Sequence, residues 1–165
     1  VIQAAMGWQD YHLWQFEAGD RLYGVPDPDW PYGDLAAARN VRLGALIERG
    51  IRDLTYTYDM GDDWRHTVMV EDVTAEDPMI DYPRFIDGAR RAPPEDVGGL
   101  PGFEEFLGAT ADPKHPEHAS VMTWYGHPFD PTDIDLDAIT VRLAKLARRR
   151  AQGKAGFEKS RNRIN

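Results

Sequence analysis

The sequence predicts an α+β fold, with strands in its first half and helices in its second half. Between His12 and Ala89, apolar and polar residues alternate in several short runs, which is the period of a half-buried strand. From Pro101 onward, apolar residues recur every three or four positions, which is the period of an amphipathic helix. We therefore expect an α-β roll, in which C-terminal helices cover a mixed or antiparallel sheet.

The expected elements begin with a helix end, because residues 1–7 resemble the last turns of a helix closed by glycine. Residues 12–18 and 21–25 flank the turn Gly19-Asp20 and predict a hairpin. The turn-rich residues 27–33 predict a surface loop. One helical turn is expected to end at Gly50.

The strongest hairpin prediction covers residues 53–71. Leu54, Tyr56 and Tyr58 alternate with polar residues before Gly61, and the alternation resumes after it from Trp64. A further short strand is expected from Arg84 to Ala89.

Three helices are expected in the second half. The first begins near Pro101, which suits an initial helical position, and the second runs from about Pro116 to Gly126. The last follows Asp130-Pro131-Thr132-Asp133, which resembles a helix cap. Its apolar residues recur at helical spacing and predict one buried stripe, made of Leu136, Ile139, Leu143 and Leu146.

Length and composition favour one domain over residues 1–151, followed by a polar basic tail over residues 152–165. A chain of 165 residues with 42% hydrophobic content can bury a core of its own. Because the first helix has no start signal, we expect an N-terminal piece to be missing from this sequence. The sequence lacks cysteine, which excludes disulfides and thiolate chemistry. It contains neither a long apolar run nor a leader, and we expect a cytoplasmic protein without a membrane anchor.

Charge is distributed unevenly along the chain. Residues 1–141 contain 10 Lys/Arg and 27 Asp/Glu, whereas residues 142–165 contain 9 basic residues and Glu158 as the one acidic residue. Phosphate backbones are bound mainly by basic side chains, so the acidic body is not expected to bind nucleic acid. The C-terminal segment could contact nucleic acid or an acidic protein, although a solvated helix face is the simpler explanation. Its candidate contacts are Arg142, Lys145, Arg148, Arg149 and Arg150.

Several strings occur in order along almost the whole chain and together resemble one family. They are Ile2–Trp8, Tyr56–His66, Pro93–Gly99, Asp112–His118 and Phe129–Pro131. Together they resemble the plasmid pRiA4b ORF-3-like family.

This resemblance implies an α+β roll and a plasmid- or transposon-linked bacterial protein. Some family members carry a TnpR-like or recombinase label. The family usually has a further N-terminal strand and the start of the first helix, so the resemblance implies that both are missing from this sequence. Many relatives have cysteines where this sequence has Ala92 and Val97. A metal or redox role of that cysteine pair therefore does not apply here.

The turn between the strongest pair of strands supplies the leading candidate site. Asp59, Asp62 and Asp63 lie close in sequence to His66, and carboxylates with an imidazole can bind a cation or transfer protons. The simpler explanation is that aspartates suit hairpin turns and that His66 is a hydrogen-bonded core residue. Spacing typical of an EF-hand is absent.

A second candidate is the pair His115 and His118, three residues apart at a helix start, which could share a metal ion. No third ligand is evident, and a capping role for His115 with a surface position for His118 is simpler.

Other site classes receive little support. Gly98-Gly99 could form an anion-binding nest, but Glu95 and Asp96 beside it disfavour phosphate, and nucleotide-binding fingerprints are absent. Neither Ser120 nor Ser160 has the surroundings of a recombinase nucleophile, and the GxSxG motif of serine hydrolases is missing.

The sequence therefore favours a non-catalytic binding domain of a mobile-element-associated bacterial protein, and we predict no cofactor. The alternative is a metal-assisted hydrolase or a related enzyme that uses Asp59, Asp62, Asp63 and His66, with His115 and His118 as further metal-ligand candidates.

Overall fold

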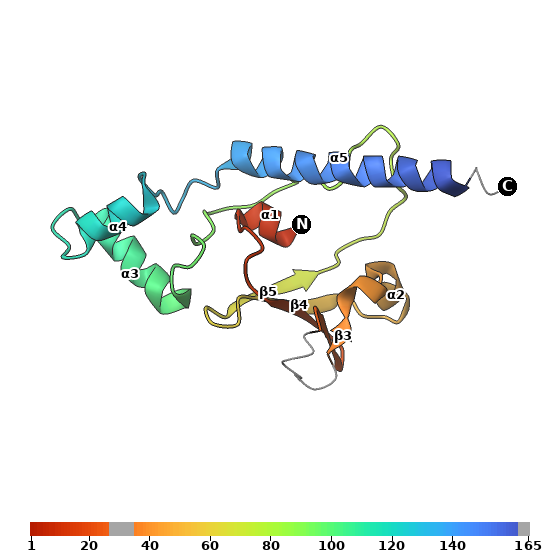
Figure 1. Cartoon of the computed structure of the whole chain (residues 1–165), viewed down its shortest axis with the longest axis horizontal. Helices are drawn as coiled ribbons and strands as arrows, with labels where there is room; N and C mark the ends of the chain where they lie inside the picture. The colour runs from red at the N-terminus through yellow and green to blue at the C-terminus, as the bar shows by residue number, and fades with distance from the viewer. Residues whose placement is uncertain (27–34, 162–165) are drawn as a thin grey trace. The chain divides into compact units, whose positions relative to one another are not determined.

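The structure is a computed structural model that describes residues 1–26 and 35–161 (Figure 1). The predicted loop over residues 27–33 lies outside the described residues. The elements, in chain order, are α1 (Ile2–Met6), β1 (Trp14–Ala18), β2 (Arg21–Gly24), β3 (Ala36–Ala37), the 3-10 turn η1 (Ala38–Asn40), α2 (Leu43–Glu48), β4 (Asp53–Tyr58), β5 (Trp64–Met69), α3 (Gly99–Ala111), α4 (His118–Tyr125) and α5 (Leu136–Arg161).

The described strands form one five-stranded mixed sheet in the order β3-β2-β1-β4-β5. The β2–β3 pair is parallel, and the β1–β2, β1–β4 and β4–β5 pairs are antiparallel. The prediction of an α+β fold with a mixed sheet is therefore confirmed. The two predicted hairpins are also present, because each pairs strands that are adjacent in the sequence.

Side-chain alternation gives this sheet one apolar face. Directly opposite residues share a face, and Phe16 lies opposite Tyr23 on one side and Tyr56 on the other. Leu46 of α2 is buried in the same cluster as Leu54 of β4, so α2 packs on this face. Other members of the cluster are Ala18 and Tyr23, with partly buried Val41, Ile51 and Val68 around them.

The strand expected from Arg84 to Ala89 is wrong, since these residues form no strand. At Gly88, an added Cβ atom would lie 2.8 Å from Ile134 and 3.2 Å from the ring of Phe85. Phe85 therefore lies back over Gly88, which an extended strand does not allow. The short strand β3 was not predicted, because two alanines carry no alternation.

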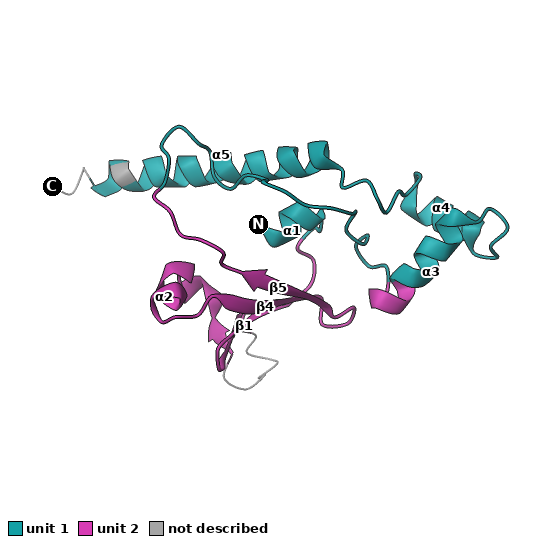
Figure 2. Cartoon of the chain, turned by 180° about the vertical axis from the view of Figure 1, so that it is seen from behind, with its two compact units in different colours: residues 1–9, 76–97, 103–165 teal, residues 10–75, 98–102 magenta. Residues whose placement is uncertain are grey.

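The chain contains two compact units (Figure 2). Unit 2 comprises residues 10–75 and 98–102 and holds the sheet with α2. Unit 1 comprises residues 1–9, 76–97 and 103–165 and holds α1, α4, α5 and most of α3.

Unit 1 is built on helix packing and an aromatic cluster. Ile139, Leu143 and Ala147 of α5 are buried, which matches the predicted apolar stripe in two of its four positions. Phe106 of α3 contacts the rings of Trp124, Tyr125 and Phe129, with centroids 5.0 to 6.0 Å apart. These edge-to-face contacts hold α4 and the segment after it against α3.

Helix α5 is longer than the sequence suggested, because it continues to Arg161 through most of the expected polar tail. Its entry is made by short polar turns, in which Asp130 and Asp133 accept hydrogen bonds from backbone N–H groups two residues later. Within the described ranges, none of the helices is both long enough and apolar enough to cross a bilayer.

Candidate functional site

The β4–β5 turn uses the carboxylate of Asp59 to hold its own backbone. Asp59 Oδ1 accepts hydrogen bonds from the N–H groups of Gly61 at 2.9 Å and Asp62 at 3.3 Å. The backbone of Asp59 itself has a positive φ of 54°, which aspartate tolerates better than most residues. This geometry gives Asp59 a clear structural task in the turn.

The other two aspartates of the turn contact different groups. Asp62 Oδ2 accepts the N–H of Gly98 at 3.1 Å, while Asp63 Oδ1 accepts from Arg65 Nε at 2.9 Å. Asp59, Asp62, Asp63 and His66 do not bring three potential ligand atoms within 4.8 Å of one another in the described part of unit 2. A neighbour that sequence reasoning missed is His12, whose Nε2 lies 3.7 Å from Asp59 Oδ2.

His66 lies on the apolar face of the sheet, opposite Tyr56. Its Nδ1 is 3.3 Å from the carbonyl oxygen of Tyr56, and the two rings are 5.8 Å apart. The tautomer with hydrogen on Nδ1 donates to that oxygen. His66 is only partly buried, and its contacts are those of a hydrogen-bonded structural histidine.

The two histidines near α4 join it to α3 within unit 1. His118 Nδ1 lies 2.7 Å from the carbonyl oxygen of Ala109, one of the last residues of α3. His115 Nδ1 accepts the N–H of Glu117 at 3.2 Å, and its Nε2 lies 3.4 Å from a carboxylate oxygen of Glu105. Each imidazole therefore has a local partner that stabilises the α3–α4 connection.

The five basic candidates of α5 have three different environments. Arg142 is half-buried and donates to the carbonyl oxygens of Ala4 and Ala5 in α1. Arg150 lies 3.5 Å from Glu76, which also pairs with Lys154. The remaining three, Lys145, Arg148 and Arg149, are exposed and form no ion pair with any described residue.

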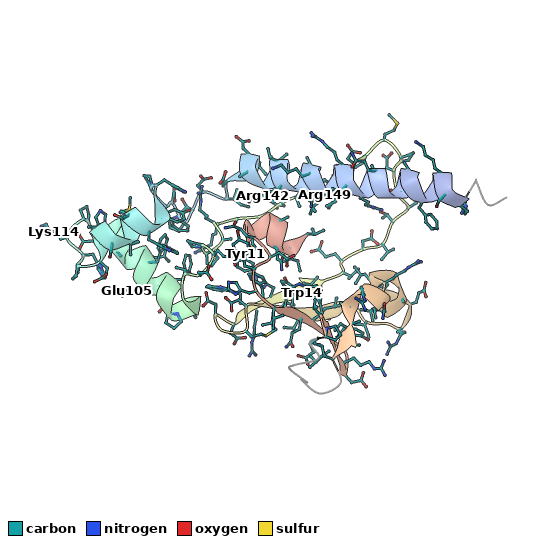
Figure 3. The ribbon with its side chains drawn as sticks, in the orientation of Figure 1. Tyr11, Trp14, Glu105, Lys114, Arg142 and Arg149 are labelled. Atoms are coloured by element: carbon teal, nitrogen blue, oxygen red, sulfur yellow. The ribbon has the colours of Figure 1, made fainter. Side chains whose placement is uncertain are left out.

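Figure 3 labels Arg142 and Arg149 on the same helix. Seven residues are slightly less than two turns, so the two side chains lie on nearly the same face of α5. Their environments differ because α1 contacts α5 at Arg142, which donates to Ala4 and Ala5.

A pocket of about 400 Å³ lies within unit 1. It forms where the residues after α1 meet the segment 91–96, with walls from the end of α4 and from Arg142. Trp8 Nε1 donates to the carbonyl oxygen of Pro93 at 3.1 Å, and the N–H of Gln9 donates to Glu95 at 2.6 Å. These bonds join two chain segments that sequence reasoning never brought together.

Arg91 forms another wall of this pocket and is firmly held. It donates from Nη2 to Asp133 Oδ2 at 2.6 Å and from Nε to the Asp133 carbonyl oxygen at 3.1 Å. Burial works to lower the pKa of Arg91, but hydrogen bonds to Tyr125 and Asp133 outweigh it and hold this pKa above its usual value. The charge of Arg91 is thus largely matched within the protein.

A second, open hollow of about 700 Å³ lies over the polar face of the sheet in unit 2. Its strand residues include Gln15, Glu17, Thr55, Thr57 and Arg65. The hollow carries both charge signs without an aromatic wall, so its chemistry indicates no particular ligand.

The chain is similar to a protein family, to a curated relative and to a solved structure. The family model described as "Plasmid pRiA4b ORF-3-like protein" matches residues 1–138. The chain is 36% identical over 162 residues to "Uncharacterized protein y4hQ" of Sinorhizobium fredii (strain NBRC 101917 / NGR234), covering 91% of this chain and 81% of the relative. A crystal structure of "Protein of Unknown Function MM3350" from Methanosarcina mazei Go1 is similar, with a TM-score of 0.72 and 33% identity, covering 82% of this chain and 77% of the other.

Proposed function

This chain belongs to the plasmid pRiA4b ORF-3-like family, and we propose that it is a non-catalytic binding domain that holds an anionic partner on the exposed basic face of α5. The observation that supports this proposal most is that Lys145, Arg148 and Arg149 lie on one face of that helix and pair with no carboxylate in the part of the chain that the structure describes.

Helical spacing places these three exposed cations of α5 on one face, which we call the basic face. Lys145 is three residues before Arg148 and four before Arg149, so the three side chains lie on adjacent turns of one surface. Lys159 follows Arg148 by three turns and extends the same face. Ile139, Leu143 and Ala147 point to the opposite side and are buried. A partner can therefore approach the cations without disturbing the packing of α5.

The contacts of several candidate catalytic and metal-ligating residues also support a binding role. The carboxylates of Asp59 and Asp62 accept backbone N–H groups, and His118 lies within hydrogen-bonding distance of a backbone carbonyl oxygen. Groups engaged in this way are poorly placed to exchange protons with a substrate.

Fluorescence anisotropy tests the proposal with two labelled anions, a short DNA duplex and a polyglutamate peptide. We expect the full chain to bind at least one of them, with affinity that falls as salt rises, since basic contacts to a polyanion release counterions. The variant Lys145→Glu/Arg148→Glu/Arg149→Glu should weaken this binding by at least about tenfold, because it replaces three attractions with repulsions.

The matched control is Arg21→Glu/Arg39→Glu/Arg49→Glu, three exposed arginines outside α5 with the same change in net charge. If both triple variants weaken binding equally, overall charge and not the α5 face is responsible, and the proposal fails. It also fails if neither anion binds at low salt.

The description of the family names a plasmid, which supports placing the protein among products of mobile elements. The proposal includes the cytoplasm of a bacterium as the place where it acts, as expected from the sequence.

A further inference from the structure

The pocket of unit 1 contains a guanidinium that the protein holds in place but does not neutralise. Arg142 donates from Nε to Ala4 at 2.6 Å and from Nη2 to Ala5 at 3.3 Å. A guanidinium has five N–H groups, so three remain for a ligand. Among the described residues, no carboxylate pairs with Arg142. A guanidinium fixed in this way is well suited to bind a carboxylate.

The pocket also has an aromatic wall with room for a ring. Trp124 is 52% exposed, which is unusual for a side chain that could bury so much apolar area. It adjoins Tyr125, with ring centroids 6.4 Å apart, and Tyr125 in turn packs on Phe106. The exposed indole is thus supported from behind by the aromatic cluster, and its other surface can receive an apolar group.

Negative charge completes the lining on the side of the 93–96 loop. Glu95 and Asp96 both line the pocket. A third carboxylate, Asp135, lies 3.8 Å from Arg91, which offsets its charge. A simple anion would meet repulsion from the loop carboxylates, and a simple cation would meet repulsion from Arg142. A zwitterion suits both charges.

We propose that this pocket binds a free amino acid with an aromatic side chain. Its carboxylate binds Arg142, its ammonium group faces Glu95 and Asp96, and its ring lies on Trp124. The volume of about 400 Å³ is within the range of small-molecule sites. This inference is independent of the basic face of α5, because Lys145, Arg148 and Arg149 do not line the pocket.

Isothermal titration calorimetry of the full chain with four probes separates the three contacts. L-phenylalanine carries all three groups, 3-phenylpropionate lacks the ammonium group, phenethylamine lacks the carboxylate, and L-alanine lacks the ring. We expect L-phenylalanine to bind at least about tenfold more tightly than each of the others, since loss of one good contact costs about this factor. No saturable binding of L-phenylalanine at millimolar concentration, or equal binding of 3-phenylpropionate, overturns the proposal.

Two variants place the ligand in the pocket. Trp124→Ala should weaken L-phenylalanine binding by about tenfold or more, whereas Phe157→Ala, which removes another aromatic ring that is 66% exposed but outside the pocket, should not. Asp96→Asn keeps a residue that tolerates the positive φ of 56° and removes the charge. It should weaken L-phenylalanine but not 3-phenylpropionate. Unchanged binding in both Trp124→Ala and Asp96→Asn would locate any binding elsewhere and contradict the inference.

Discussion

Arg142 of α5 binds the carbonyl oxygens of Ala4 and Ala5 near the C-terminal end of α1, through Nε at 2.6 Å and Nη2 at 3.3 Å. A cation at this end of a helix satisfies carbonyl oxygens that have no partner within the helix. Gly7 then ends α1 with a φ of 86°, and a Cβ atom there would lie only 3.5 Å from the guanidinium carbon. One arginine thus holds α1 against α5, although they are more than 130 residues apart in sequence.

We predict that Arg142→Ala destabilises unit 1 by about 1–3 kcal/mol, because the variant removes two hydrogen bonds to a charged donor from a partly buried position. Urea unfolding monitored by circular dichroism measures this change. Amide exchange should also become faster at Ala5 and Gly7, whose N–H groups bond within α1. Arg149→Ala is the matched control and should change stability by less than about 0.5 kcal/mol, because Arg149 is exposed. Equal losses in both variants would show that the α1 contact contributes nothing.

We predict that Gly99→Ala destabilises the protein by about 2 kcal/mol or more. Gly99 has a φ of 65°, and an added Cβ atom would lie 2.7 Å from the backbone carbonyl oxygen of Asp62, which cannot move without disturbing the β4–β5 turn. The control is Gly108→Ala in α3, where nothing lies within 4 Å and alanine should stabilise the helix by about 0.5–1 kcal/mol. Thermal unfolding of the two variants measures the contrast, and a neutral Gly99→Ala would contradict it.

The fold could be predicted from sequence wherever a local period was present. The alternation in residues 53–71 correctly gave β4 and β5, and helical spacing correctly gave α5. Residues 84–89 have no regular alternation, since the apolar Phe85 and Ile86 are adjacent, and these residues have no neighbouring strand in the described sheet. Periodicity reports which face of a segment is apolar and not which segment it will pair with.

The candidate sites depend even more on contacts between distant segments, which local sequence patterns do not report. Residue types at the β4–β5 turn suggested chemistry as well as a turn, and the structure gives Asp59 the local backbone partner that a turn predicts. The backbone partner of Asp62 is Gly98, which is 36 positions away and has no local signature. The pocket of unit 1 depends on the Trp8–Pro93 bond, between residues separated by 85 positions. Arg142 was grouped with the exposed cations of its helix because its position relative to α1 has no local signature.

We predict that His118 serves to connect α3 and α4, so that His118→Asn retains most of the stability and His118→Ala loses about 1 kcal/mol. In the original chain, His118 Nδ1 lies 2.7 Å from the Ala109 carbonyl oxygen. The amide nitrogen of asparagine can replace Nδ1 as the donor to this oxygen, whereas alanine leaves the oxygen without this donor. Urea unfolding of the two variants measures the difference. If zinc raises the stability of the original chain and both variants lose that effect, His118 is a metal ligand and this assignment is wrong.

We predict that Thr132→Val raises the pKa of Asp130 toward its usual value. The Thr132 hydroxyl donates to Asp130 Oδ1 at 2.7 Å, and the Thr132 N–H donates to the same oxygen at 2.8 Å. These two bonds, the hydroxyl first, hold the pKa of Asp130 below that of an ordinary aspartate. Valine removes the hydroxyl and keeps the N–H, so the pKa should rise but remain lowered.

The sign of the linked stability follows from this lowered pKa. The Asp130 carboxylate binds a proton less readily in the folded protein than in the unfolded chain. The contribution of ionised Asp130 to folding stability is therefore present above the unfolded pKa, and it is lost as the pH falls through the folded pKa. Titration of the Asp130 carboxyl carbon by NMR, in the original chain and in Thr132→Val, measures both values. A pKa of Asp130 that does not change in the variant would mean that the hydroxyl bond does not form in solution.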